Sequence, residues 1–155
     1  MSIGSVFHEA KANGWRDDDK YQKPTAAQIE TRRIAQAERN TEAAKALALS
    51  QQNAAKKAAW ILHQAKTEKH AYLHSKGWMD AVGPVWWPDE ANNLLCIPMR
   101  VGAHLVGVQL IDREGAKKFL TGQRTSGAEH VISNDGPGAQ DWLVEGYASG
   151  LSLRE

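Results

Sequence analysis

The sequence predicts an α+β protein in which a long alanine-rich helix precedes a mainly antiparallel meander of short strands. Two observations support this prediction. Residues 25–66 hold 13 alanines and neither glycine nor proline, a composition typical of one continuous helix. After residue 66, short apolar runs alternate with glycine-containing turns, and connections this short join antiparallel strands.

The chain begins with a predicted short helix and a charged linker. Four apolar residues between positions 3 and 10 follow helical spacing, and Gly14 is a natural end for that helix. Every residue of the run 16–20 is charged, which predicts a solvated linker rather than a cation site at its three aspartates. We therefore assign residues 1–24 to a first segment.

Residues 25–66 are predicted to form a helical arm. Large apolar side chains are scarce in its first half and cluster only at positions 60–62, so the helix has little to bury along most of its length. We expect a projecting or loosely packed arm whose C-terminal turns dock on the core. Seven basic and three acidic residues give this segment a net charge of +4 in a chain of net charge +1. A basic helix facing DNA, a spacer between domains and a dimer surface all remain open.

The predicted core occupies residues 67–140. A short helix begins near His70 and is stopped by Gly77. Five strand-like runs then follow, divided by turn residues, at 85–87, 94–99, 105–111, 116–120 and 129–132. A last apolar strand at 141–144 leads into a helix from Ala148, so residues 141–155 are predicted to be the beginning of a further domain, cut short.

Composition excludes several classes of protein. With 155 residues, 42% of them hydrophobic and 24% charged, the chain is expected to fold rather than to be disordered. Its longest apolar runs are far shorter than the roughly 20 residues of a membrane helix, and no secretory leader is evident. The single cysteine, Cys96, excludes an internal disulfide and a cysteine zinc cluster. We expect a soluble, cytoplasmic protein with no membrane partner.

Ordered sequence patterns between residues 70 and 153 carry a family resemblance. They read HAYL at 70–73, IPMR at 97–100, GVQLID at 107–112, GAKKFL at 115–120, SG and HVI within 126–132, and LVEGYASGLSL at 143–153. In this order and spacing the chain resembles DNA primases of the Toprim type found in phages and conjugative plasmids. The likeness covers their N-terminal portion and ends just after the first Toprim motif.

The resemblance implies template-directed synthesis of RNA primers on single-stranded DNA from nucleoside triphosphates. It makes Glu145 the candidate catalytic and metal-binding residue, as the first Toprim carboxylate for Mg²⁺ or Mn²⁺. A carboxylate at the end of a strand, followed by glycine and a helix, projects into the crevice where α/β sheets bind ligands. One carboxylate alone is a poor magnesium site, and the DxD pair of Toprim domains has no counterpart after Glu145. We therefore expect this chain by itself not to polymerise nucleotides.

Four basic residues are the candidates for binding template or nucleotide phosphates: Arg100, Lys117, Lys118 and Arg124. We expect Arg100 and the Lys118 region to line one face of the meander. The plainer alternatives are a solvated strand face for these residues, and for Glu145 an acid favoured by a helix N-terminus.

Other interpretations remain open. The chain is alternatively a non-catalytic module that binds single-stranded DNA or a replication partner, or a fragment of a Toprim nuclease or topoisomerase. A replicative helicase, separate or fused, is a further candidate partner. His63, His70 and His74 have a spacing that suggests a metal, but no fourth ligand is near, so we favour a capping or packing role for His70. Trp86 and Trp87 are expected to belong to the core and its rim rather than to stack bases.

Overall fold

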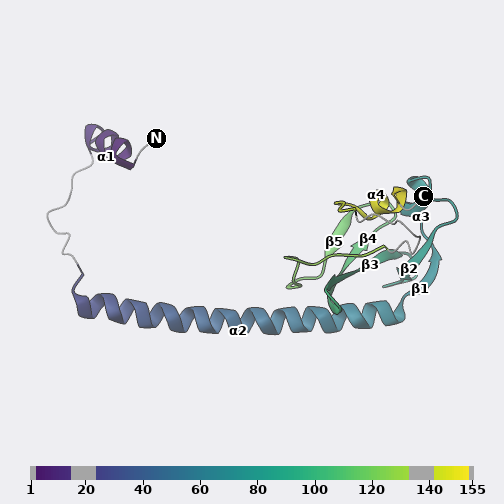
Figure 1. Ribbon diagram of the computed structural model, residues 1–155, viewed down its shortest axis with the longest axis horizontal. Helices are drawn as coiled ribbons and strands as arrows, with labels where there is room; N and C mark the ends of the chain where they lie inside the picture. Colours follow the sequence, from purple (N-terminus) through teal and green to yellow (C-terminus); the bar gives the residue numbers. More distant parts are fainter. Residues whose placement is uncertain (1–2, 15–23, 133–141, 154–155) are drawn as a thin grey trace. The chain divides into compact units, whose positions relative to one another are not determined.

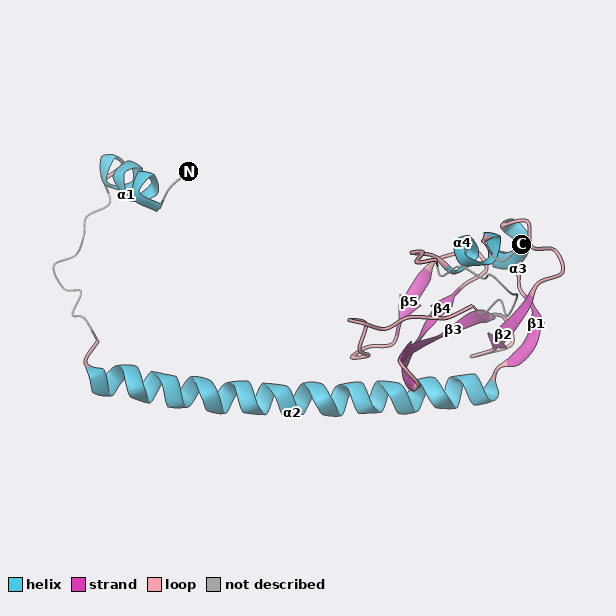
Figure 2. Ribbon diagram, viewed as in Figure 1, coloured by secondary structure: helices cyan, strands magenta, loops and turns pink. Residues whose placement is uncertain are grey.

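The computed structural model describes residues 3–14, 24–132 and 142–153, and it confirms the α+β class (Figure 1). Its helices are α1 (Ile3–Ala12), α2 (Ala26–Gln64), α3 (Ala71–Ser75) and α4 (Tyr147–Ser152). Its strands are β1 (Lys66–Lys69), β2 (Val82–Trp86), β3 (Leu94–Val101), β4 (His104–Ile111) and β5 (Lys117–Phe119). All five strands form one antiparallel sheet in the order β1-β2-β3-β4-β5 (Figure 2).

The chain divides into two compact units, Met1–Glu42 and Ala43–Glu155. In the first unit, α2 begins with a reciprocal capping box. Thr25 Oγ1 accepts a hydrogen bond from the Gln28 backbone N–H at 3.3 Å, and Gln28 Oε1 accepts one from the Thr25 N–H at 2.9 Å. Each bond satisfies a backbone donor that the first turn of a helix leaves unpaired.

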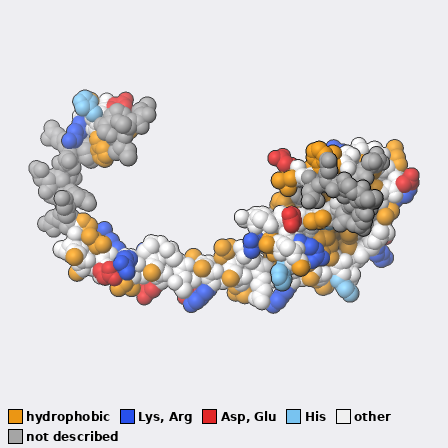
Figure 3. All heavy atoms as spheres, in the orientation of Figure 1, with side chains coloured by type: hydrophobic (Ala, Val, Ile, Leu, Met, Phe, Trp, Pro, Cys, Tyr) orange, Lys and Arg blue, Asp and Glu red, His pale blue; other side chains and the backbone are white. Residues whose placement is uncertain are grey.

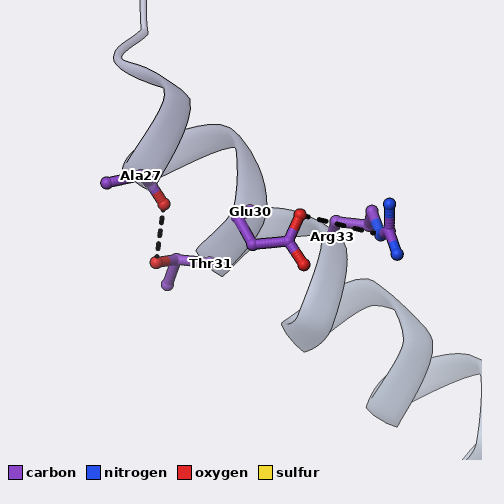
Figure 4. A network of polar contacts seen from close by, with 4 residues as sticks. All are labelled: Ala27, Glu30, Thr31 and Arg33. Carbon is purple, nitrogen blue, oxygen red and sulfur yellow. Dashed lines mark hydrogen bonds and ion pairs between the residues drawn. The ribbon is translucent and has the colours of Figure 1, made fainter.

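Contacts within this first part of α2 are local and lie on the surface. Thr31 donates from its hydroxyl to the Ala27 carbonyl at 2.9 Å, and the Arg33 guanidinium lies 3.8 Å from the Glu30 carboxylate (Figure 4). An exposed ion pair such as Glu30–Arg33 stabilises a helix by only a few tenths of a kcal/mol, and a hydroxyl bond to the carbonyl four residues earlier adds no stability. Since α2 has no buried residue before Ala54, composition and capping hold this half of the helix.

In the second unit, the C-terminal turns of α2 dock on one face of the sheet, as the sequence predicted. Ala54, Ala58 and Ile61 share one helix face through their spacing of four and three residues, and all three are buried. Ala58 and Ile61 pack in a cluster with Cys96 of β3 and with Val108 and Leu110 of β4. Small alanines let the helix backbone approach the strands closely. We call this side of the sheet the α2 face.

The opposite side, here called the α4 face, is covered by α3 and α4 (Figure 1). Its buried cluster comprises Tyr72, Leu73, Val85, Leu95, Ile97 and Ile111. Helix α4 packs at the margin of this cluster through three partly buried residues, Tyr147, Ala148 and Leu151. The sheet is therefore the middle layer of three.

The side chain of Gln123 joins β4 to the loop that follows β5. Its Oε1 accepts hydrogen bonds from the backbone N–H groups of Val108 and Leu120, each at 3.1 Å. The adjacent Gly107 leaves the space that this amide occupies, because a Cβ there would overlap the Gln123 side chain. One residue earlier in the loop, Gly122 has a φ of +76° and abuts Ser50 of α2, so it has neither room nor a suitable backbone for a side chain.

Strand prediction succeeded for β3, β4 and the edge strand β5, placed β2 at 85–87 instead of Val82–Trp86, and missed the other edge strand, β1. Strand β1 was missed because its sequence, KTEK, lacks the apolar alternation of a half-buried strand. It forms because Lys66 to Lys69 pair with Val85 to Val82. The predicted strand 129–132 is wrong, since only Glu129 pairs there, through two 2.8 Å hydrogen bonds with Arg100.

The predicted strand at 141–144 is also wrong over residues 142–144, whereas Asp141 lies outside the described residues. Trp142, Leu143 and Val144 form no strand, and Leu143 is 97% exposed. Their apolar character favours a strand only where a partner strand supplies hydrogen bonds, and no described strand pairs with them. The charged linker predicted at 16–20 lies outside the described residues as well.

Among the described residues, no helix combines the length and the apolar character that crossing a membrane requires.

Candidate functional site

Several of the sequence patterns that carry the family resemblance meet on the α4 face. Tyr72, from the HAYL pattern, lies against Gly115, the first residue of GAKKFL, although 43 positions separate them in the sequence. A Cβ at Gly115 would lie 3.2 Å from Tyr72 Cδ2, and its φ of +91° suits glycine alone. The backbone conformation therefore favours glycine at position 115, and the Tyr72 ring leaves little room for a side chain there.

His130 connects three more of these patterns. Its Nδ1 lies 3.0 Å from the backbone carbonyl of Pro98 in β3, so this nitrogen carries a proton and donates it. The His130 ring also contacts the ring of Tyr147 in α4, with the two centroids 5.6 Å apart and the planes inclined by 59°. Burial lowers the pKa of His130, and the nearby positive charge of Arg100 acts in the same direction. We expect a neutral imidazole that fixes α4 to the sheet at neutral pH.

The segment that carries Glu145 is held close to β5. Gly146 is the N-cap of α4, and a Cβ built on it would lie 3.9 Å from Lys117 Nζ. Within α4, a Cβ at Gly150 would lie 3.0 Å from Cδ1 of Ile132, so the absence of a side chain allows close packing. Gly150 therefore lets α4 pack closely against Ile132, two residues after His130.

Glu145 itself is exposed, and in the described part of the chain its carboxylate has no salt-bridge partner. Within residues 3–14, 24–132 and 142–153, no three His, Cys, Asp or Glu side chains form a group able to hold a metal ion. Glu145 is thus a single exposed carboxylate next to Gly146, and a magnesium site built on it needs ligands beyond those described.

The four predicted phosphate-binding residues do not gather in one groove. Lys117 pairs with Ile111 and lies on the α4 face, whereas Lys118 pairs with Leu110 and lies on the α2 face. Arg100 pairs with Leu105, a residue of the α2 face, and its guanidinium donates to the Ala103 carbonyl at 3.0 Å.

Arg100 and Lys118 share a face but are separated by two strand spacings, about 10 Å, and by roughly 13 Å along the strands. Arg124 lies in the loop after β5, where its Nε donates to the Ser126 carbonyl at 3.0 Å. On the face that Figure 3 shows, the Lys and Arg side chains over the described residues form separate groups. The structure therefore divides the candidate basic residues into Lys117, which lies near Gly146 on the α4 face, and the remaining three.

His70 has the capping role that the sequence analysis favoured. Its Nδ1 accepts a hydrogen bond from the Tyr72 backbone N–H at 3.3 Å at the start of α3, and its Nε2 lies 3.4 Å from the Asn93 carbonyl. The side chain is 3% exposed, and this burial lowers its pKa. His63 and His74 are both exposed.

Sequence reasoning did not assign a role to His130 or Gln123. In the sequence, His130 was noted only as the first residue of the HVI pattern, and that pattern was the one available signal for its role. Gln123 gave no signal at all, because nothing in a single sequence shows which glutamine accepts backbone hydrogen bonds.

Compared with known proteins, the chain matches no family model, no curated protein sequence and no solved structure.

Proposed function

We propose that this chain is the N-terminal part of a Toprim-type DNA primase, which synthesises RNA primers on single-stranded DNA. The observation that carries the proposal is the convergence of the sequence patterns in space. Tyr72 meets Gly115, Pro98 and Tyr147 both meet His130, and Lys117 approaches Gly146. These contacts bring residues of separate patterns together on the α4 face, as expected if the patterns serve one site.

In this proposal, Glu145 supplies one carboxylate ligand for Mg²⁺ or Mn²⁺. Such ions neutralise phosphate charge and orient phosphoryl groups in nucleotidyl transfer. The described residues do not complete the site, so we assign no reaction step to them. Lys117 lies on the same face and close to the backbone next to Glu145, a suitable place for a cation that contacts the phosphates of the incoming nucleotide.

The remaining basic residues are assigned to the template strand. Arg100 and Lys118 lie on the α2 face, and Arg124 lies in the loop after β5. Their side chains are exposed and have no acidic partner among the described residues, so they are available to phosphates. In this assignment, Lys117 binds the nucleotide on the α4 face, whereas Arg100 and Lys118 bind the template strand on the α2 face.

The proposal is tested by primer synthesis with the protein expressed from its full reading frame, in magnesium and in manganese. Glu145→Gln is expected to abolish synthesis while single-stranded DNA binding persists, because the amide keeps the shape but loses the charge that binds the metal. Glu114→Gln, an equally exposed carboxylate in the turn before β5, is the matched control and should retain synthesis. Synthesis at the wild-type rate by Glu145→Gln would remove Glu145 from the mechanism.

The second candidate is a non-catalytic module that binds single-stranded DNA. The observation in its favour is that exposed basic residues occur on a folded unit whose described residues hold no metal-binding group. Under both candidates, Arg100→Ala and Lys118→Ala weaken a salt-sensitive interaction with single-stranded DNA. Only the primase loses a reaction on Glu145→Gln. Cleavage of DNA in the same assay would instead favour the Toprim nuclease.

A further inference from the structure

Two tryptophans form an exposed aromatic surface on the α2 face. Trp60 of α2 and Trp86 of β2 are in edge-to-face contact, with ring centroids 6.0 Å apart and planes inclined by 77°. Trp60 is 55% exposed and Trp86 is half-buried. The buried cluster beneath them already comprises Ile61, Cys96 and Val108, so the outer face of the Trp60 ring is not needed to fill the core.

The charge around this aromatic pair is positive. Lys56 and Lys57 precede Trp60 by four and three residues on α2, the spacings at which helix side chains are neighbours. Both lysines are exposed, and neither has a salt-bridge partner in the described part of the chain. Both lysines therefore belong to the helical turn that precedes the exposed ring of Trp60.

Acidic residues are absent from this region of the sequence. Between Glu42 and Glu68 the chain contains no Asp or Glu. Glu68 lies on the opposite side of the sheet, because it pairs with Gly83, two residues from Val85 of the α4-face cluster. There its carboxylate accepts a hydrogen bond from Trp87 Nε1 at 3.1 Å. The aromatic pair thus has cations near it on the helix and no anion on the same helix segment.

We propose that Trp60, supported by Trp86, is a stacking platform for a base of single-stranded DNA, and that Lys56 and Lys57 contact the adjacent phosphates. Proteins that bind single strands combine aromatic rings for stacking with basic side chains along the backbone. An apolar protein surface would gain from the ring but not from the lysines, which association has to desolvate, whereas a single strand supplies both a base and phosphates. The inference rests on the proposed function and deepens it, because it adds an aromatic contact for the single strand to the α2 face, which also carries Arg100 and Lys118.

The test measures binding of a fluorescent oligothymidylate to the 155-residue chain across a salt series. Trp60→Leu keeps an apolar side chain but removes the flat ring, and it is expected to weaken binding at least about fivefold, since stacking on one aromatic ring contributes that much or more. Trp60→Phe should retain part of the affinity. The matched control is Trp142→Ala, which removes a tryptophan that is 64% exposed outside the platform and should leave binding unchanged.

The lysines are tested through the salt dependence. Replacing both Lys56 and Lys57 by glutamine should reduce the slope of log K against log salt by about 1.4, the value for two lost contacts to a single strand. Thermal melts followed by circular dichroism check that each variant folds.

The outcomes separate this inference from the proposed function. If Trp60→Leu and the double lysine variant bind like the wild type while Lys118→Ala binds weakly, the platform is overturned and the primase proposal stands. A change in sedimentation without a change in DNA affinity would show that Trp60 contacts a second copy of the chain, which also overturns the inference. Weakened binding in the Trp60 and lysine variants supports it whatever the primer-synthesis assay shows.

Discussion

Helices α2 and α4 lie on opposite faces of the sheet and bury very different amounts of side chain. On the α2 face, α2 contributes Ala54, Ala58 and Ile61, all of them buried. On the α4 face, α4 contributes no buried residue and only lies at the margin of the cluster around Tyr72. Elements with few buried apolar contacts open locally at low free-energy cost, whereas buried elements unfold with the domain.

This difference matters for function because Glu145 lies immediately before α4. The proposed metal ligand therefore lies next to the least firmly attached helix of its unit. The most firmly attached helix, α2, carries Trp60 of the proposed stacking platform. Attachment of α4 depends on close contacts at specific positions, namely His130 with Tyr147 and Gly150 with Ile132. A metal or a further part of the fold that binds Glu145 would stabilise α4 through mass action.

The sharpest test of the comparison uses two tyrosines on the α4 face. Tyr72→Ala is expected to lower the free energy of unfolding by about 3–5 kcal/mol, because the ring is 4% exposed and its loss leaves a cavity. Tyr147→Ala should cost much less in global unfolding but should accelerate amide hydrogen exchange in Ala148–Ser152. Equal losses of global stability would show that α4 is as firmly built in as α3.

The next test compares two isoleucines of the same helix. Ile61→Ala is expected to destabilise the second unit by about 2–5 kcal/mol, since Ile61 is fully buried against the strands. Ile34→Ala is the matched control: its side chain is 53% exposed, and the change should stay within about 0.5 kcal/mol. Urea denaturation followed by circular dichroism measures both, and similar values would contradict the described docking of α2.

The smallest expected effect is a dependence on pH. The pKa of His70 is lowered by burial, so the folded state favours the neutral imidazole and binds fewer protons than the unfolded chain. The stabilisation is therefore complete above about pH 6.5, the ordinary histidine pKa, and is lost as the pH falls through the lower pKa of the folded state. The free energy of unfolding at pH 7.5 and pH 5.5 measures this loss.

His70→Asn should flatten that dependence, because asparagine still accepts a hydrogen bond as an N-cap but does not titrate. His130 shifts in the same direction, so part of the dependence should remain in this variant. His74→Asn, on the exposed side of the same helix, is the control and should behave like the wild type. A steeper acid loss in His70→Asn than in the wild type would contradict the assigned protonation.

Some elements were predictable because local chemistry alone decides them. Helix α2 was found within a few residues of its observed ends, since alanine favours a helix and Pro24 and Thr25 mark its beginning. Strands β3 and β4 were found because their apolar runs are bounded by turn residues. Strand β1 and residues 142–144 were misjudged for one reason: a strand exists only with a partner, and pairing is not a local property.

The candidate site divides in the same way. Glu145 was selected from the sequence through the family resemblance, and the basic residues through that resemblance and their clustering between positions 100 and 124. The faces of Lys117 and Lys118 were decided by strand register, in which neighbouring residues point to opposite sides. The contact between Trp60 and Trp86 also depends on tertiary structure, since it joins a helix to a strand 26 positions later.

The amino-acid sequence alone determined which local features the chain contains: a long basic helix, two apolar strands, and a glutamate followed by glycine. Tertiary packing alone decided which of these share a surface. The physical reason is that composition and short-range spacing set local backbone preference, whereas contacts between distant residues depend on strand pairing and burial. Tyr72 against Gly115, His130 against Tyr147 and the exposed ring of Trp60 all belong to the second kind.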